Sequence, residues 1–244
     1  MKRAPEKTAR HGLARTLSKL GACSRTQAAQ YAREGRVSIN GRVVRDPETP
    51  VDAEHDHIAL DGREIRAAER VYLMLNKPRG YVTTASDERG RETVYALLED
   101  AGLPWMAPVG RLDKASEGLL LLTNDSAWAA RITAPESHVE KTYHVQIDRL
   151  PDAALLASLK RGVDEDGERL SAKDVRELRR GAKNAWLEIV LDEGRNRQIR
   201  RLLAAHGIGV LRLVRVAIGP VALGTLAKGA FRSLDRSEIA ALAL

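Results

Sequence analysis

The first apolar positions that recur along the chain have the spacing of one face of a helix. Leu13, Leu17 and Leu20 lie at i, i+4 and i+7, which predicts a short amphipathic helix. Gly21 follows the last leucine directly. Helices commonly end at such a glycine, because it adopts the left-handed conformation without a steric penalty.

A second helix and a hairpin are expected next. Ser24 is followed three residues later by Gln27, the capping-box pattern that starts a helix, and this helix should stop near Gly35. The run RVSINGRVV then places β-prone residues on both sides of Asn40 and Gly41. Asn-Gly strongly favours a two-residue hairpin turn, so the N-terminal segment predicts two short helices and a hairpin.

The rest of the chain combines apolar runs of period two, which predict strands, with runs of period three to four, which predict helices. The expected strands cover residues 71–84 (interrupted at 77–80), 119–122, 141–148, 186–194 and 211–219, and the expected helices cover 151–162 and 196–207. The regular βαβ spacing of a doubly wound sheet is missing. We therefore predict an α+β fold: a small basic helix–hairpin domain over 1–60, a charged linker over 61–70, and a larger domain with a mixed, mainly antiparallel sheet over 71–244.

Charge is concentrated at one end of the chain. The 244 residues contain 40 Lys and Arg against 33 Asp and Glu, a net charge of +7. Residues 1–45 alone contain eleven basic and two acidic side chains, so that this segment carries +9 and the remainder −2. A compact, strongly basic segment indicates a polyanionic partner such as nucleic acid.

Cysteine content and hydropathy argue against secreted and membrane-spanning proteins. Cys23 is the single cysteine, so an intrachain disulfide is impossible. The sequence contains no apolar run near the roughly 18 residues that a membrane-spanning helix needs. The opening MKRAPEKTAR lacks the apolar core of a secretory signal. We expect a cytoplasmic protein without a membrane partner.

One carboxylate stands at an informative place in this pattern. In GRLDKASEGLLLLTND, Asp113 lies between a turn and four leucines of a buried strand, two residues after Arg111. A lone carboxylate in a turn most often belongs to a surface salt bridge. The sequence lacks the common signatures for dinucleotide, nucleoside triphosphate and zinc binding and for serine nucleophiles. The residues alone therefore leave the role of Asp113 open.

The N-terminal run LSKLGACSRTQAAQYAREGRVSINGRVV resembles the RNA-binding domain first described in a small-subunit ribosomal protein. The Ser-Arg pair that opens the second helix and the G-x-V-x-I-N-G hairpin carry this resemblance. It implies that the helix and hairpin bind the phosphates of folded RNA. The residues expected to contact RNA here are Arg25, Arg33, Arg36, Asn40 and Arg42.

The run GRLDKASEGLLLLTND in turn resembles the catalytic signature of the bacterial ribosomal-RNA pseudouridine synthases, the RsuA family. Three more stretches resemble this family and occur in its order: LNKPRGYVTT, EKTYHV and EGRNRQIRRLLAAHG. The resemblance covers nearly the whole chain. It implies the isomerisation of a uridine in ribosomal RNA to pseudouridine, without metal or organic cofactor. Because a base inside a helix is out of reach, the target nucleotide has to flip out. We expect the enzyme to be a monomer.

The resemblance also implies roles for individual residues. Asp113 matches the nucleophile, Tyr143 the aromatic residue that stacks on the target base, and Arg200 the basic residue that pairs with the aspartate. Further RNA contacts are expected at Lys77, Arg111, Lys141 and Arg197. Ala115 departs from the family, which usually has an acidic or amide residue there. Such a residue could brace the turn, so the departure is expected to affect the loop around Asp113.

Two other functions compete with this one. A catalytically silent RNA-binding ribosome-assembly factor could keep the fold, although binding alone would not require Asp113, Tyr143 and Arg200 together. A hydrolase could pair Asp113 with Glu117 or Asp125. Because Asp125 follows the leucine strand that Asp113 precedes, and a strand rises about 3.3 Å per residue, the sequence disfavours that carboxylate pair.

Overall fold

The computed structural model describes residues 10–85, 87 and 89–243. Residues 1–9 of the domain expected over 1–60 lie outside the described residues. The described chain divides into two compact units. The N-terminal unit contains the described residues up to 71 together with 101–107 and 124–126, and the C-terminal unit contains the others.

Both helices predicted for the N-terminal unit are confirmed. Helix α1 spans Leu13–Lys19 and helix α2 spans Arg25–Arg33. The capping box is present as well, because the Ser24 hydroxyl accepts a hydrogen bond from the Gln27 amide and the Gln27 side chain accepts one from the Ser24 amide. The first backbone donors of α2 are thus satisfied within the helix.

The predicted hairpin is confirmed, and its turn is formed by Asn40 and Gly41 as expected. Strands β2 (Val37–Ile39) and β3 (Arg42–Val43) pair antiparallel. Asn40 and Gly41 have φ of 50° and 79°, and two consecutive positive φ angles define the type I′ turn that matches the twist of a hairpin.

A small sheet completes the N-terminal unit. Its four strands lie in the order β3–β2–β5–β6, with β5 at Ile58–Leu60 and β6 at Arg63–Glu64. Strand β1 (His11–Gly12) pairs separately with β4 (Pro50–Val51). Because β6 falls inside the segment expected as a linker, the first residues of that segment form an edge strand.

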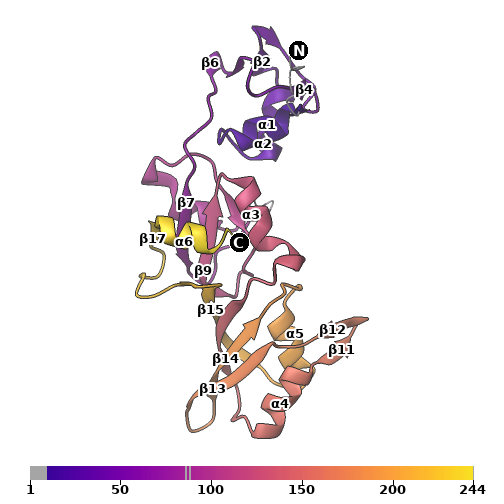
Figure 1. Ribbon diagram of the computed structural model, residues 1–244, viewed down its shortest axis with the longest axis vertical. Coiled ribbons are helices and arrows are strands. Elements are labelled where there is room, and N and C mark those ends of the chain that lie inside the picture. The colour runs from indigo at the N-terminus through magenta and orange to yellow at the C-terminus, as the bar shows by residue number, and fades with distance from the viewer. Residues whose placement is uncertain (1–9, 86, 88, 244) are drawn as a thin grey trace, which may run out of the picture. The chain divides into compact units, whose positions relative to one another are not determined.

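The C-terminal unit is built on a nine-stranded sheet (Figure 1) with the main order β13–β14–β10–β15–β9–β7–β17. Strand β16 pairs with β15, and β8 pairs with β9. The β9–β15 pair is parallel. The pairs β10–β14, β10–β15, β13–β14, β15–β16, β7–β17 and β7–β9 are antiparallel. The predicted mixed, mainly antiparallel sheet is confirmed. The strands are β7 (Tyr72–Lys77), β8 (Ala107–Val109), β9 (Glu117–Thr123), β10 (Lys141–Ile147), β13 (Asp174–Arg180), β14 (Ala185–Leu191), β15 (Val210–Ile218), β16 (Val221–Ala222) and β17 (Phe231–Ser233).

Helices bury two parts of this sheet (Figure 1). Helices α4 (Ala153–Arg161) and α5 (Gln198–Ala204) share a core with β10, β13 and β14. Helices α3 (Ser126–Thr133) and α6 (Arg236–Ala241) share a second core with β7 and β9. Three short 3-10 helices span Val94–Leu97, Glu99–Ala101 and Pro135–Ser137. No helix among the described residues is long and apolar enough to cross a bilayer.

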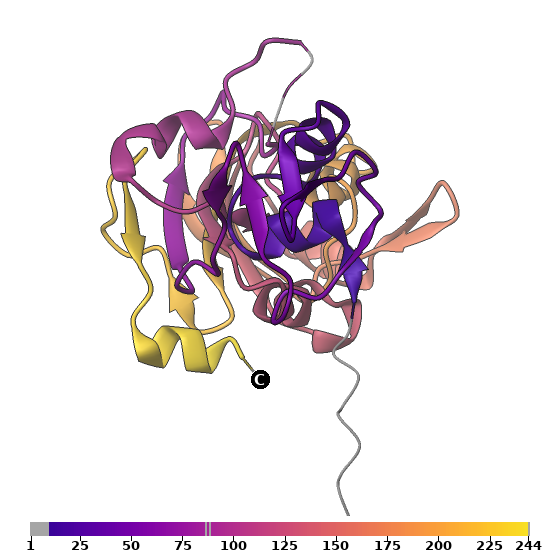
Figure 2. The same cartoon turned by 90° about the horizontal axis from the view of Figure 1, so that it is seen from above.

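A two-stranded hairpin extends from the C-terminal unit, as Figure 2 shows. It consists of β11 (Val163–Glu165) and β12 (Glu168–Leu170), which pair only with each other. Its turn residues Asp166 and Gly167 have φ of 50° and 76°. The hairpin therefore repeats the turn chemistry of β2–β3, and its acidic side chains lie next to α5.

Strand β9 is the most deeply buried strand of the sheet. All seven residues from Glu117 to Thr123 are buried, which confirms the strand predicted from the four leucines. Leu119 and Leu121 pack into the core that contains Trp128 of α3. Because β9 is fixed on both faces, it is a rigid support for the loop that precedes it.

A glycine allows β9 to approach β15 closely. Gly118 has φ of 99°, and a Cβ atom on it would lie 2.2 Å from the Arg215 carbonyl oxygen and 2.9 Å from the Arg215 nitrogen. A side chain at residue 118 would thus separate the parallel strand pair, in which Gly118 is the register partner of Arg215.

We predict that Gly118→Ala destabilises the protein more than Gly167→Ala. Both glycines have positive φ, but a Cβ on Gly167 would meet no atom within 4 Å. The Gly167 change should cost about 1–2 kcal/mol for the left-handed conformation, and the Gly118 change about 1–3 kcal/mol more for the clash. Urea unfolding followed by circular dichroism measures both. Equal losses would contradict the close approach of β9 and β15.

Candidate active site

A cavity of about 660 Å³ opens on the C-terminal unit. The loop before β9 and strands β10 and β15 form part of its wall, and the start of α5 forms another part. All three residues expected to be catalytic line this cavity, as do several of the expected RNA contacts. The residues concerned are Asp113, Tyr143, Arg200, Arg111, Lys141 and Arg197.

The loop that carries Asp113 is held by its backbone. Each of the five consecutive carbonyl groups from residue 112 to 116 accepts a hydrogen bond. The donors from outside the loop are the Thr83 hydroxyl, the Lys77 ammonium, the Gly80 amide and the Arg200 guanidinium. Because buried carbonyl groups lose free energy when they are unpaired, this arrangement strongly favours one loop conformation.

Lys77 is the central donor to the loop. Its side chain is fully buried, and Nζ donates to the carbonyl oxygens of Pro78, Asp113 and Ser116 at 3.1, 3.2 and 2.8 Å. Burial lowers the pKa of Lys77 to about 8, although the charges of Asp113 and Glu117 oppose this shift. The expected RNA contact at Lys77 is therefore wrong, because its three donors face the protein and water does not reach it.

Asp113 points its carboxylate toward the start of α5. Oδ2 lies 3.6 Å from Nη1 of Arg197, and the two side chains are 37% and 50% exposed. The resemblance had implied Arg200 as the partner of the aspartate. In the structure the ion pair is formed by Arg197 instead, one turn earlier in the chain.

Arg197 has a strained backbone conformation at the start of α5. It is the N-cap of α5 with φ of 48°, a left-handed conformation that costs a non-glycine residue free energy. Gln198 stabilises this turn from within, because its side chain accepts from the Arg195 amide and donates to Glu193 and to the Ser171 carbonyl. Such strain is typical of functional loops and is retained only where neighbours enforce it.

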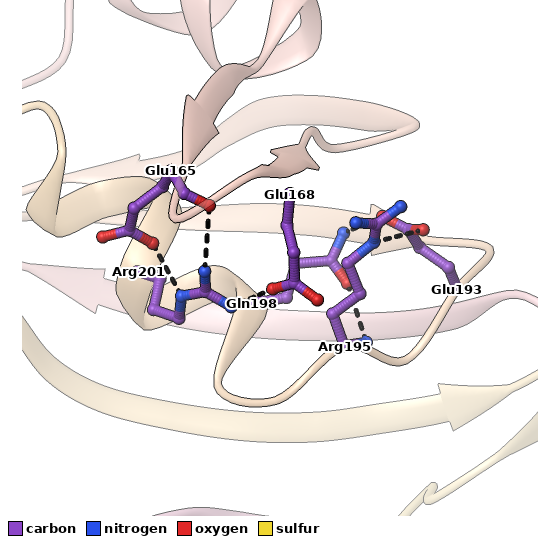
Figure 3. A network of polar contacts seen from close by, with 6 residues as sticks. All are labelled: Glu165, Glu168, Glu193, Arg195, Gln198 and Arg201. Atoms are coloured by element: carbon purple, nitrogen blue, oxygen red, sulfur yellow. Dashed lines mark hydrogen bonds and ion pairs between the residues drawn. The ribbon is translucent and has the colours of Figure 1, made fainter.

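Figure 3 shows how this turn continues into a network of charged residues. Arg195 pairs with Glu193 at 2.9 Å. Arg201 pairs with Glu165 at 2.6 Å and with Glu168 at 2.5 Å. Arg201 therefore joins α5 to the β11–β12 hairpin and is neutralised by two glutamates.

Arg200 braces the loop rather than the carboxylate of Asp113. Its Nη2 donates to the Ala115 carbonyl at 3.1 Å. Burial lowers the pKa of Arg200 and the nearby Arg197 acts in the same direction, whereas the charge of Asp113 opposes both. The Ala115 departure thus leaves a well-anchored loop, because the backbone at that residue is held by Arg200.

Strand β10 contributes two side chains to the cavity. Lys141 and Tyr143 are both partly buried and lie two residues apart, on the same side of the strand. Burial lowers the pKa of Lys141, and the charge of Arg215 lowers it further. Arg111 is exposed at the edge of the cavity.

Arg215 also lines the cavity and is not among the residues predicted from the sequence. It lies on β15 as the register partner of Tyr143 and is 5% exposed. The signal was present in LRLVRVAIG, where the arginine has the same parity as two leucines of an alternating strand. Such a position indicates a buried cation that needs partners.

The expected RNA contacts of the N-terminal unit are of two kinds. Arg25, Arg33 and Arg42 are exposed, and no ion pair involves them among the described residues. Arg36 pairs with Asp61 at 2.6 Å. The Asn40 side chain is bonded to Asp56 and to the His57 amide; the Asn40 side chain is therefore committed to holding the hairpin.

Arg25 belongs to a cluster of three cations, together with Arg15 and Lys19. The charges of Arg15 and Arg25 both lower the pKa of Lys19, after burial as the larger cause. All three side chains are exposed and lie on α1 and the start of α2. Cations that repel one another on a folded surface favour binding of an anion between them.

The carboxylates of the competing hydrolase hypothesis are engaged elsewhere. Glu117 is buried and bonds to Arg212 at 3.1 Å and Lys228 at 2.6 Å. Asp125 pairs with Arg70 at 3.0 Å. Neither of them lines the cavity that contains Asp113.

The two units also match different families of known proteins. Residues 71–205 match the family described as RNA pseudouridylate synthase, and residues 12–58 match the S4 domain.

Similar proteins cover nearly the whole chain. An RNA pseudouridine synthase of Aquifex aeolicus, named as uncharacterized, is 39% identical over 93% of this chain and 91% of its own length. Ribosomal large subunit pseudouridine synthase B of Bacillus subtilis is 34% identical over 93% of each chain. A crystal structure of a pseudouridylate synthase matches with a TM-score of 0.66 and 33% identity, over 95% of this chain and 99% of its own.

We predict that Lys77 makes stability depend on pH above neutrality. In the folded chain its pKa is about 8, below the ordinary 10.5. Between these values the unfolded chain binds more protons, so raising the pH favours folding. The free energy of unfolding of the wild type, relative to Lys77→Met, should rise from pH 8 to 10 by up to about 1.4 kcal/mol per pH unit. Urea unfolding between pH 6 and 10 measures it, and a difference that is constant over this range would contradict the buried ammonium.

Proposed function

The chain belongs to the RNA pseudouridylate synthase family, and from this premise we propose that it isomerises specific uridines of ribosomal RNA, with Asp113 as the nucleophile and the target nucleotide flipped out of its helix. As a member of this family the protein is an RNA pseudouridine synthase, an isomerase. The ribosomal substrate is supported by the name of the Bacillus subtilis relative, a ribosomal large subunit pseudouridine synthase.

The single observation that carries the mechanism is the anchoring of Asp113 in the cavity. Its backbone carbonyl is bonded to Lys77, and its side chain is free to face a ligand, with Arg197 3.6 Å away. A carboxylate is one of the side-chain groups that act as nucleophiles in enzymes, and Arg197 is close enough to orient it. The carboxylate attacks either the sugar or the base.

Tyr143 and Arg200 support the same proposal. Tyr143 lines the cavity and offers a flat surface on which a flipped base can stack. Arg200 fixes the loop through Ala115, so we propose that it positions Asp113. Arg111 and Arg197, which are more exposed, are proposed to bind phosphates of the flipped nucleotide, with Lys141 beside Tyr143 as a further contact.

The N-terminal unit is proposed to bind the same RNA. The S4 match over residues 12–58 supports this role, and so does the cluster of Arg15, Lys19 and Arg25. Because the isomerisation changes no oxidation state, we propose that the chain acts without an organic cofactor. We also propose that it acts as a monomer, in the cytoplasm where ribosomes are assembled.

We predict that Asp113→Asn abolishes isomerisation while RNA binding and fold persist. The amide is nearly isosteric with the carboxylate, but it is neither charged nor nucleophilic. Release of tritium from uracil carbon 5 of labelled ribosomal RNA measures turnover. The loss should be at least about 10⁴-fold, comparable to the removal of other catalytic nucleophiles.

The matched control is Asp166→Asn at the tip of the β11–β12 hairpin. It makes the same chemical change at a position of positive φ that asparagine tolerates well, and full activity is expected. A wild-type enzyme that binds RNA but releases no tritium would instead favour the RNA-binding assembly factor. Near-normal release by Asp113→Asn would remove Asp113 from the mechanism.

We predict that the charge cluster of the N-terminal unit contributes salt-dependent RNA affinity. Replacing Arg15, Lys19 and Arg25 together by glutamine should reduce the slope of log affinity against log salt by about 2–3, since each lost phosphate contact removes about 0.7–0.9. The full-length chain is used, and binding to ribosomal RNA fragments is measured at several salt concentrations.

Arg66→Gln serves as the control for this experiment. Arg66 is exposed in the same unit but pairs with Glu64 at 2.8 Å, so its loss should leave the slope nearly unchanged. If the triple variant keeps the wild-type slope, this cluster does not face the RNA.

A further inference from the structure

The proposed mechanism does not use two of the cations that line the cavity, Arg195 and Arg215. Arg195 is paired with Glu193, so Arg215 is the more informative of the two. It lies in the middle of β15, opposite Tyr143 on β10 and opposite Gly118 on β9. The close approach at Gly118 brings the arginine beside the start of β9. Its Nε donates to the Leu119 carbonyl at 2.7 Å, which fixes the plane of the guanidinium group. Residue 215 also lies beyond the segment that matches the synthase family.

One nitrogen of this guanidinium group has no acceptor. Nη2 of Arg215 is buried, and among the described residues nothing accepts a hydrogen bond from it. A buried donor without a partner destabilises a folded protein, and native structures contain few of them. Because Arg215 lines the cavity, a ligand that binds there is the candidate acceptor for this nitrogen.

The surroundings of Arg215 favour an acceptor with negative charge. The cations near it are Lys77 and Lys141. Burial lowers the pKa values of both lysines, and the charge of Arg215 lowers them further. The acids that act on the same two lysines are Asp113, Glu117 and Asp192. Glu117 is already paired with Arg212 and Lys228. The inner part of the cavity therefore keeps an excess of positive charge.

We propose that Arg215 donates a hydrogen bond from Nη2 to a carbonyl oxygen of the target uracil and stabilises the detached uracil anion. This inference rests on the proposed function. The uracil carbonyls are favoured over a phosphate because Arg215 is buried beside Tyr143, the residue proposed to stack on the base. Phosphates of a flipped nucleotide stay near the surface, where Arg111 and the half-exposed Arg197 are available.

The chemistry explains why a cation is needed at this point. When the bond between uracil N1 and sugar C1′ breaks, its electron pair stays on the ring, which becomes an anion delocalised over N1 and the carbonyl oxygens. In the route in which Asp113 attacks the sugar, its carboxylate bonds to C1′ as the uracil leaves. After the ring rotates, an electron pair of the ring forms the C5–C1′ bond, and the bond between C1′ and the carboxylate breaks. C5 then loses its proton and N1 gains one, so the product is an isomer of the substrate. A fixed donor stabilises the anion more than the neutral base, which accelerates the reaction.

The test measures single-turnover isomerisation at saturating enzyme, together with RNA affinity, for the wild type, Arg215→Met and Arg215→Lys. We expect Arg215→Met to lose about 10²–10³-fold in rate, the usual effect of removing one such donor, with affinity within about twofold. Arg215→Lys should recover part of the rate, because it keeps the charge but not the fork of two donors. Arg179→Met is the control, since Arg179 stacks on Trp186 and does not line the cavity.

A second measurement identifies the partner atom and works with the lysine variant if the methionine variant does not fold. The target uridine is replaced by 2-thiouridine or 4-thiouridine, in which sulfur is a weaker acceptor than oxygen. One of the two substitutions should slow the wild type by a larger factor than it slows the Arg215 variant. The intrinsic effect of sulfur cancels in this comparison.

Two results would overturn the inference. One is a saturated rate of Arg215→Met equal to that of the wild type. The other is a loss of affinity with an unchanged saturated rate, which would assign Arg215 to the RNA backbone. A wild-type enzyme that isomerises no ribosomal uridine would instead remove the proposed function, so that the two failures are distinguishable.

Discussion

The site depends on a buried ammonium group that binds backbone rather than substrate. Moving a lysine out of water is unfavourable, and Lys77 is fully buried. The three carbonyl groups that accept from it offset this loss, and two of them belong to the loop of Asp113. The same contacts orient the loop, because a loop that moved away would leave a charge unpaired in the interior. The carboxylate that we propose as the nucleophile is thus held by an interaction that does not use its own oxygens.

The remaining cations of the cavity divide by depth. Arg111 and Arg197 are accessible to water, which suits contacts with phosphates that are attracted from solution. Arg200, Lys141 and Arg215 are more deeply buried, where a charge acts more strongly on a nearby reacting group because the surroundings are less polarisable. In the proposed mechanism a single cavity therefore combines a mouth that attracts RNA with an interior suited to a change of charge during the reaction.

Local patterns in the sequence predicted the parts of the fold that local interactions determine. The capping box at Ser24, the Asn40–Gly41 turn and the leucine strand β9 are all confirmed, because each depends on neighbouring residues or on simple burial. Strand β13 was not predicted, since DVRELRR looks like a solvated segment. Arg176 in fact pairs with Glu188 on the neighbouring strand, and Arg180 pairs with Glu177 within β13. A cross-strand pair of this kind cannot be read from one segment.

The site shows the same limit. Sequence resemblance indicated Asp113, Tyr143 and Arg200, and all three line one cavity. It could not show that Lys77 is buried, because a lysine in a turn is usually exposed. It also could not distinguish Arg197 from Arg200 as the partner of Asp113. Arg197 is the left-handed N-cap of α5 and lies 3.6 Å from the Asp113 carboxylate, and neither fact can be read from the sequence alone.

The two loops near the Asp113 carboxylate are held in the same way, by buried or partly buried side chains that form hydrogen bonds to the loop backbone. In the first, Lys77 and Arg200 fix the backbone around Asp113; in the second, Gln198 fixes the strained turn before α5. Gln198 is almost fully buried, and Arg201 attaches α5 to the β11–β12 hairpin. None of these four side chains has to touch the RNA. Most of their donors are satisfied by the protein, whereas Nε of Arg200 is buried without an acceptor among the described residues. In the proposed mechanism the groups that face the substrate are Asp113, the arginines at the mouth of the cavity, and Nη2 of Arg215. In the proposed mechanism the accuracy of the site therefore comes from residues behind it, and the substrate completes the hydrogen bonding of Arg215.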